Sequence, residues 1–292
     1  MKPPEFDYVR PASLADAIAV LRSEEDAKLL AGGQSLVPLL NMRLVRPRVV
    51  VDLARLTELQ GIGPVDGTLR IGAMVTQREA ETSPAIADGC PLLVEALGLV
   101  AHPPIRNRGT IGGSLAHADP AAELPAVVLL LDGVLHATGG GGERAIPAAQ
   151  FFRSYLTTAL EPDEVLTAVD LPLPAPAAGW ACREITRRPG DFPLCGAACL
   201  LEIDSDGALA DMRLALYGAA DRPVRAHAAE ERLRGERAEA QLLAEAAAMA
   251  AQDLEPVGNL QGSPAYRRHL AEVVARRTME AALAKGGPHA EH

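Results

Sequence analysis

A proline-rich segment, LPLPAPAAG at Leu171–Gly179, divides this 292-residue chain into two parts with different patterns. Three prolines in nine residues are incompatible with a helix interior or a central strand, so this segment is expected to be a linker. Before it, short apolar runs alternate with helical stretches, which is typical of α/β structure. After it, strands come first and helices follow, which indicates a separate α+β domain.

The first part carries start signals for several helices. Ser13 with Asp16 and Thr76 with Glu79 have the spacing of capping boxes. A helix capped by Ser35 would place Leu36, Leu39, Leu40 and Leu44 on one face. The expected strands are 28–31, 49–53 and 69–73, the other expected helices are 92–101 and 123–131, and the glycine run 139–142 is expected to be a turn between strands.

The second part begins with three expected strands, at 183–186, 195–203 and 209–217. Ser205-Asp206-Gly207 is a hairpin signal between the last two. Alanine-, glutamate- and arginine-rich helices are expected from Ala226 onward, including one at 236–251. Ser263 followed by proline is a further helix start.

Composition and charge exclude several classes of partner and site. The net charge of −10 and the 3% aromatic content argue against a nucleic-acid ligand. No apolar run reaches the roughly 18 residues of a membrane span, and the amino-terminal residues lack the apolar core of a signal peptide, so we expect a cytoplasmic protein. The four cysteines form no CxxC pair. We therefore expect buried, reduced thiols, no iron–sulfur cluster on this chain and no metal site.

Two glycine turns are the most informative motifs, AGGQS at 31–35 and TIGGS at 110–114. Glycine lets another group approach the backbone closely, and successive amides in such turns can form a concavity that binds anions. Neither the dinucleotide fingerprint GxGxxG nor the P-loop pattern occurs after the first strand. From the residues alone, a phosphate-bearing ligand and a ligand-free tight turn both remain open.

These turns and their surroundings resemble the flavoprotein medium subunits of the xanthine dehydrogenase and carbon monoxide dehydrogenase family. Four segments carry the resemblance in the family's order, over about residues 3–280: 6–21, 29–44, 105–126 and 183–198. The resemblance implies a mixed α and β fold, with a PCMH-type FAD-binding domain of two subdomains and a carboxy-terminal α+β domain that has an antiparallel sheet and helices. The implied bounds are 1–175 (subdomains 1–55 and 56–175), 176–285 and a tail at 286–292.

The same resemblance assigns residues to the cofactor. FAD would lie between the subdomains with its pyrophosphate on the two turns, and the loop 187–192 would lie against the flavin ring. Glu123 occupies the place of the family's acidic residue, with Asp119 as a second candidate, and Arg183 lies where some relatives have a lysine. The residues expected to bind FAD are Ala31, Gly32, Gly33, Gln34, Ser35, Thr110, Ile111, Gly112, Gly113, Ser114, Glu123, Asp191 and Phe192.

Close approach of the backbone to the pyrophosphate is expected at Gly33, Gly112 and Gly113, so replacing Gly112 with valine should leave a folded chain that is poor in flavin. Phe192 would stack on the flavin, although a role as core filling is an alternative. His102 and His117 flank the second turn; His117 is expected to shape that turn rather than to bind a metal.

The function implied by the resemblance is electron transfer. Electrons would pass from a molybdenum-binding large subunit, through 2Fe–2S clusters on a small subunit, to the FAD of this chain and then to an external acceptor. No catalytic residue is expected here, and a dimer of heterotrimers is usual in the family. Two alternatives remain: a stand-alone FAD-dependent oxidase or reductase, and an interaction or assembly subunit that lacks FAD.

Overall fold

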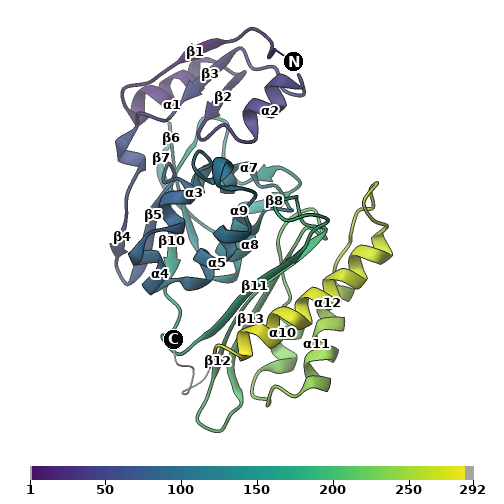
Figure 1. Cartoon of the computed structure of the whole chain (residues 1–292). Coiled ribbons are helices and arrows are strands. Elements are labelled where there is room, and N and C mark those ends of the chain that lie inside the picture. Colours follow the sequence, from purple (N-terminus) through teal and green to yellow (C-terminus); the bar gives the residue numbers. More distant parts are fainter. Residues whose placement is uncertain (1, 287–292) are drawn as a thin grey trace.

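The structure is a computed structural model that describes residues 2–286. The chain forms three units, each built on its own sheet (Figure 1). Helices mix with strands throughout, and the larger sheets are antiparallel, which confirms the predicted fold class. The predicted tail at 286–292 lies outside the described residues, except for Gly286. None of the helices in the described part of the chain has the length and apolar character needed to cross a membrane.

The first unit is a parallel sheet with the strand order β1-β3-β2. Ser13 begins α1 by accepting a hydrogen bond from the Asp16 amide, and Ala17, Ile18 and Leu21 form the buried face of this helix. Because β2 and β3 are parallel, their carboxyl ends lie at the same edge of the sheet. The elements are β1 (Asp7–Val9), α1 (Leu14–Ser23), β2 (Ala27–Leu30), α2 (Leu36–Asn41) and β3 (Val49–Asp52).

Helix α2 is shorter than predicted. It ends at Asn41, and Leu44, which was expected on its apolar face, is 68% exposed. Arg43 has a φ of 59°, and this left-handed conformation stops the helix before another turn can form. The predicted capping by Ser35 is also wrong, because its side chain makes no capping hydrogen bond.

The second unit is an antiparallel sheet with the order β4-β5-β10-β6-β7, covered by short helices. Thr76 and Glu79 form the complete capping box that their spacing predicted. The turn between β6 and β7 lies at Gly139–Gly142, as expected. The elements are η1 (Thr57–Leu59), β4 (Ile62–Val65), β5 (Thr68–Gly72), α3 (Gln77–Glu81), α4 (Pro84–Gly89), α5 (Pro91–Leu99), α6 (Pro103–Arg106), α7 (Ile111–His117), α8 (Glu123–Leu130), β6 (Val134–Gly139), β7 (Gly142–Pro147), α9 (Ala148–Phe151), β8 (Phe152–Ser154), β9 (Thr157–Thr158) and β10 (Val165–Pro172).

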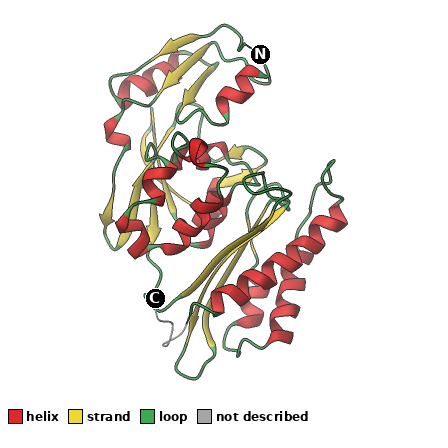
Figure 2. Ribbon diagram, viewed as in Figure 1, coloured by secondary structure: helices red, strands yellow, loops and turns green. Residues whose placement is uncertain are grey.

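The third unit is an antiparallel sheet with the order β11-β12-β13-β14, and α10, α11 and α12 lie together beside it (Figure 2). The strands predicted at 195–203 and 209–217 coincide with β12 and β13, and Ser263 caps α12 as expected. The helix predicted at 236–251 begins only at Ala240, because Gly235 turns the chain after α10. The elements are β11 (Gly179–Ile185), β12 (Cys195–Ile203), β13 (Leu209–Tyr217), β14 (Val224–Arg225), α10 (His227–Leu233), α11 (Ala240–Gln252) and α12 (Pro264–Leu283).

The sheet of the third unit joins two cores. Along β12, Ala198 and Leu200 belong to the core of the second unit, while Ala197, Cys199 and Leu201 pack with α11 and α12. This alternation follows from the two faces of a strand. The connection between the units is shorter than the predicted linker, since only residues 173–178 lie between β10 and β11. The second and third units are therefore packed together through a shared core, to which one face of the third sheet contributes side chains. Only a short connection joins the two units along the chain.

Candidate cofactor site

The first glycine turn presents a run of unused backbone donors. Gly33 has a φ of 75°, which turns the chain sharply between β2 and α2. Within the described residues, none of the amides from Gly32 to Ser35 donates a hydrogen bond to the protein. The side chain of Gln34 donates to the Gly32 carbonyl at 3.1 Å and so supports the turn. Four consecutive free amides are the chemistry expected of an anion site.

The second glycine turn is different, because its amides are already engaged. The amides of Ile111 and Gly112 donate to the carbonyls of Val75 and Ala73 at 2.9 and 2.8 Å. The Gly113 amide donates to the hydroxyl of Thr110, which begins α7, at 3.0 Å. The Ser114 amide donates to the Thr110 carbonyl. The second turn therefore offers side chains and packed backbone to a ligand rather than free amides. This differs from the expectation that both turns form an anion-binding concavity.

The two turns, 79 positions apart in sequence, pack directly against each other. A β-carbon at Gly32 would collide with the Arg108 carbonyl and would lie 2.8 Å from the Gly109 Cα atom. One at Gly113 would lie 3.2 Å from the β-carbon of Ala31. Glycine is thus required where the first unit meets the second, and the free amides of the first turn lie beside the start of α7.

Gly112 has a structural role that the sequence did not reveal. It is buried, and a β-carbon there would lie 2.7 Å from the Cα atom of Ala73 in its own unit. Valine at this position would displace α7 from the segment after β5, so a folded but flavin-poor chain is the wrong expectation for that variant. The backbone contact explains the glycine without any ligand.

Glu123 is a buried acid with no cation beside it. It is the first residue of α8, is 7% exposed, and its carboxyl makes no hydrogen bond to another side chain among the described residues. Burial, together with the smaller effect of the charges of Glu184 and Asp119, raises the pKa of Glu123 to about 8. Asp119 itself accepts a hydrogen bond from the Ala121 amide at 2.9 Å, so Asp119 is already used in the local turn.

The loop at 187–192 lies over the second unit. Gly190, with a φ of 83°, packs on the ring of His102, and a β-carbon there would lie 2.6 Å from the His102 Nε2 atom. The loop therefore lies next to α6, which leads into the second glycine turn. Phe192 is 70% exposed and Asp191 is also exposed, which excludes core filling as the role of Phe192.

The remaining candidates have protein partners. Arg183 forms an ion pair with Glu95, which also pairs with Lys285. His117 lies in the last turn of α7, and burial lowers its pKa. Among residues 2–286 no three potential metal ligands come together. All four cysteines are buried and free, as expected, and burial raises the pKa of Cys90 to about 11, so its thiol stays protonated.

Three residues near the site were not predicted from the sequence. Tyr217, on β13, is buried with its hydroxyl 3.3 Å from a Glu184 oxygen, and burial raises the pKa of Glu184 to about 7. Gly196, on the neighbouring strand β12, leaves the space that the Tyr217 ring fills. The buried Oε1 atom of Gln77 has no hydrogen-bond partner in the described part of the chain, and it lies against Gly109. Of these, only Tyr217 could have been found from the sequence, because it is an aromatic residue with a polar hydroxyl at an inward-facing position of a predicted strand.

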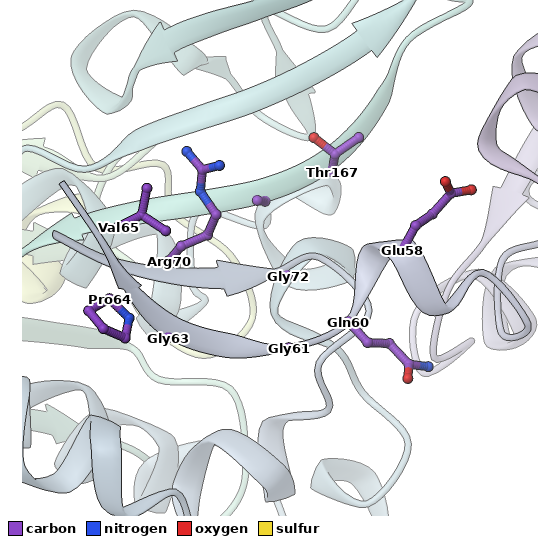
Figure 3. A pocket seen from close by; sticks show the side chains of 10 residues that line it. Glu58, Gln60, Gly61, Gly63, Pro64, Val65, Arg70, Gly72 and Thr167 are labelled. Atoms are coloured by element: carbon purple, nitrogen blue, oxygen red, sulfur yellow. The ribbon is translucent and has the colours of Figure 1, made fainter.

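A surface hollow lies elsewhere, around Arg70 between η1 and the sheet of the second unit (Figure 3). Its volume of about 200 Å³ is below the range of roughly 300–1,000 Å³ typical of small-ligand pockets. It contains none of the residues predicted to bind FAD. The candidate site is instead the region around the two glycine turns, which pack against each other. Glu123 begins α8, which contacts α7, and the loop at 187–192 packs beside α6.

Comparison with known proteins identifies this arrangement. Residues 4–174 match the FAD binding domain in molybdopterin dehydrogenase, and residues 180–282 match the CO dehydrogenase flavoprotein C-terminal domain. The chain is 41% identical to the 6-hydroxypseudooxynicotine dehydrogenase complex subunit alpha of Paenarthrobacter nicotinovorans, covering 100% of this chain and 99% of the relative.

Solved structures agree with the sequence matches. A chain of carbon monoxide dehydrogenase from Hydrogenophaga pseudoflava superposes with a TM-score of 0.96 at 37% identity, covering 98% of this chain and 100% of the other. A chain of quinoline 2-oxidoreductase from Pseudomonas putida 86 superposes with a TM-score of 0.93 at 40% identity, covering 97% and 98%. The chain therefore belongs to the FAD-binding medium subunits of the molybdenum hydroxylase family, and it is an oxidoreductase subunit.

Proposed function

We propose that this chain relays electrons through FAD, from iron–sulfur clusters on a small subunit to an external acceptor, within a complex whose large subunit carries molybdenum. A bound flavin accepts and releases electrons singly or in pairs, while the protein binds it, orients it and controls access of water. The observation that carries the proposal is the run of four free amides at Gly32–Ser35, in a chain of this family.

The candidate residues have different roles in the proposed binding of FAD. The first turn supplies amide donors for the pyrophosphate, and the second turn, at 110–114, forms the wall against which the first turn is held. Glu123, neutral over much of the physiological range because of its burial, supplies a hydrogen-bonding group for a sugar hydroxyl. Phe192 and Asp191 cover the ring from the third unit, where the exposed aromatic side chain can stack on a flavin and exclude water.

Partners and location follow from the same proposal. The names of relatives include the medium subunit of a hydroxylase and the medium chain of a dehydrogenase, which implies larger and smaller companions in those complexes. We propose one molybdenum-binding large subunit and one 2Fe–2S small subunit per chain, with two such heterotrimers in the assembly. The free, buried cysteines agree with a reducing cytoplasm.

The test is rapid mixing of the purified complex with a reducing substrate of its large subunit. Bleaching of the flavin absorbance is expected in the complete complex and not in the isolated FAD-loaded chain. Bleaching in the isolated chain would identify a stand-alone oxidase or reductase instead. A purified chain that cannot be loaded with FAD would leave only an assembly role and would refute electron relay.

A further inference from the structure

A buried arginine lies at the base of the loop at 187–192. Arg267 is the fourth residue of α12 and is only 6% exposed. Helix α12 packs along β11 and β12, which are the two strands that the loop connects (Figure 1). A charged side chain is almost never this buried unless other groups compensate its charge. The partners of Arg267 therefore show what it does in the fold.

Backbone carbonyls, rather than an acid, compensate Arg267. Its Nη1 atom donates hydrogen bonds to the carbonyls of Leu194 at 2.8 Å and Gly218 at 2.7 Å. Among residues 2–286 no carboxylate forms an ion pair with it, and its buried Nε atom has no acceptor. An apolar side chain could fill the same space without burying a partly unsatisfied charge. Packing alone therefore does not explain an arginine at this position.

The two carbonyls belong to segments that lead to the second unit. Leu194 comes two residues after the loop at 187–192, and Gly218 directly follows β13. Gly218 has a φ of 78°, and a β-carbon there would lie 3.2 Å from the Pro193 carbonyl oxygen. The Gly218 amide donates to the carbonyl of Pro120, between α7 and α8, at 2.7 Å. One guanidinium thus joins the end of the loop to a residue that is itself bound to the second unit.

The start of the loop is fixed by the neighbour of Gly218. The Tyr217 hydroxyl lies 3.3 Å from an oxygen of Glu184, which stands on β11 three residues before the loop. Between its two ends the loop is largely open to solvent, and Phe192 is 70% exposed. The loop therefore has a base that is held at both ends and an exposed middle that carries the aromatic ring.

We propose that Arg267 is a positioning residue for the cofactor, which it does not touch: it holds the loop at 187–192 where Phe192 covers the flavin. This role rests on the function proposed above, in which the loop lies over FAD. Because one nitrogen bonds to both carbonyls, loss of the guanidinium separates the end of the loop from Gly218, and so from the second unit. The loop then opens more often and covers the flavin ring less well.

Limited proteolysis of the FAD-free chain measures opening of the loop. Trypsin can cut the exposed bond between Arg187 and Arg188 once the loop opens far enough to enter the protease. Arg267→Met keeps an apolar stem and removes both hydrogen bonds, so cleavage there should become about tenfold faster. The matched control is Arg268→Met, on the same helix, because exposed Arg268 donates instead to the Leu254 carbonyl at 3.0 Å. This control should leave the cleavage rate unchanged.

Two further comparisons separate opening of the loop from general unfolding. Cleavage between Arg276 and Arg277, both exposed on α12, requires unfolding of the helix and should stay slow in every variant. Arg267→Lys keeps a cationic donor on a shorter stem, so its rate at the loop should lie between those of the parent and Arg267→Met. Equal rates at the loop in parent and Arg267→Met, or an equal increase at both bonds, would overturn the proposal.

Fluorescence quenching by iodide measures cover over the flavin in the complex loaded with FAD. Iodide quenches on contact, so a less covered ring gives a larger quenching constant. Arg267→Met should raise this constant toward the value of Phe192→Ala, in which the covering ring is absent, while Arg268→Met should match the parent. Faster cleavage of the loop with unchanged quenching would also overturn the proposal, because the loop held by Arg267 would then not cover the flavin.

Uptake of FAD by the parent chain keeps this role apart from the proposed function. A parent chain that takes up no FAD would refute the proposed function, and with it any role of Arg267 toward the flavin. If the parent takes up FAD, and Arg267→Met equals it in both cleavage and quenching, only the role of Arg267 is refuted.

Discussion

Glu123 gives the sharpest test of the site's electrostatics. Its carboxyl is 7% exposed, lacks a cationic partner in the described residues, and has its pKa raised by burial from 4.5 to about 8. Because the folded chain holds this proton more tightly than the unfolded chain does, stability is fully present below about pH 4.5 and is lost as the pH rises to about 8. Above that pH, the charged group costs the fold on the order of 5 kcal/mol.

Replacement by glutamine keeps the shape of the side chain and removes the titration. At about 1.4 kcal/mol for each pKa unit, the charge on Glu123 costs roughly 1 kcal/mol at pH 5.5 and between about 4 and 5 kcal/mol at pH 8.5. Glu123→Gln should therefore gain about 3 kcal/mol more stability over the parent at pH 8.5 than at pH 5.5. Glu184, whose pKa is raised to about 7 mainly by its own burial, remains in both proteins and cancels to first order.

The assay is urea unfolding of the FAD-free chain at both pH values, monitored by circular dichroism. The control is Glu255→Gln, because Glu255 is exposed. This substitution should change the free energy of unfolding by the same small amount at both pH values. An identical pH dependence for Glu123→Gln and the parent would refute the account of Glu123 as a buried acid without compensation. FAD binding by the same variant then measures whether the side chain contacts the cofactor.

Three further predictions concern the packing around the turns. Gly32→Ala should push the two turns apart, because its β-carbon would collide with the Arg108 carbonyl. The flavin-to-protein absorbance ratio should fall, and the free energy of unfolding in urea should drop by about 1–3 kcal/mol. Gly63→Ala, where a β-carbon meets no other atom, should change neither quantity. Phe192→Ala should leave the melting temperature of the FAD-free chain within about 2 °C of the parent, because the ring is exposed. The same variant should shift the visible absorption spectrum of bound flavin. An unchanged spectrum would exclude stacking of Phe192 on the flavin. Arg106→Met should cost about 1–3 kcal/mol in thermal unfolding, because it removes a guanidinium that lies 3.0 Å from Glu81 and donates to the Val100 carbonyl, while Arg78 still pairs with Glu81; no measurable loss would show that Arg78 and water replace that partner.

Local signals in the sequence predicted most of the elements. The spacing of Thr76 and Glu79 encodes a complete capping box, and the apolar runs at 195–203 and 209–217, with the turn signal between them, encode two strands to the residue. These signals depend only on neighbours three or four positions away, or on the two faces of a strand, so they can be recognised without the rest of the fold. The order of the four motif segments along the chain was also sufficient to identify the family.

Contacts between distant segments were decided only by the tertiary structure. The two glycine turns look alike in sequence, yet the amides of 32–35 are free while those of 111–114 are bound to the segment after β5 and to Thr110. Gly112 is a packing glycine and Arg43 is a left-handed helix end, and neither role follows from the residues beside it. Which amide is satisfied, and which space a missing side chain leaves, depends on what another part of the chain places there, and that is known only once the chain has folded.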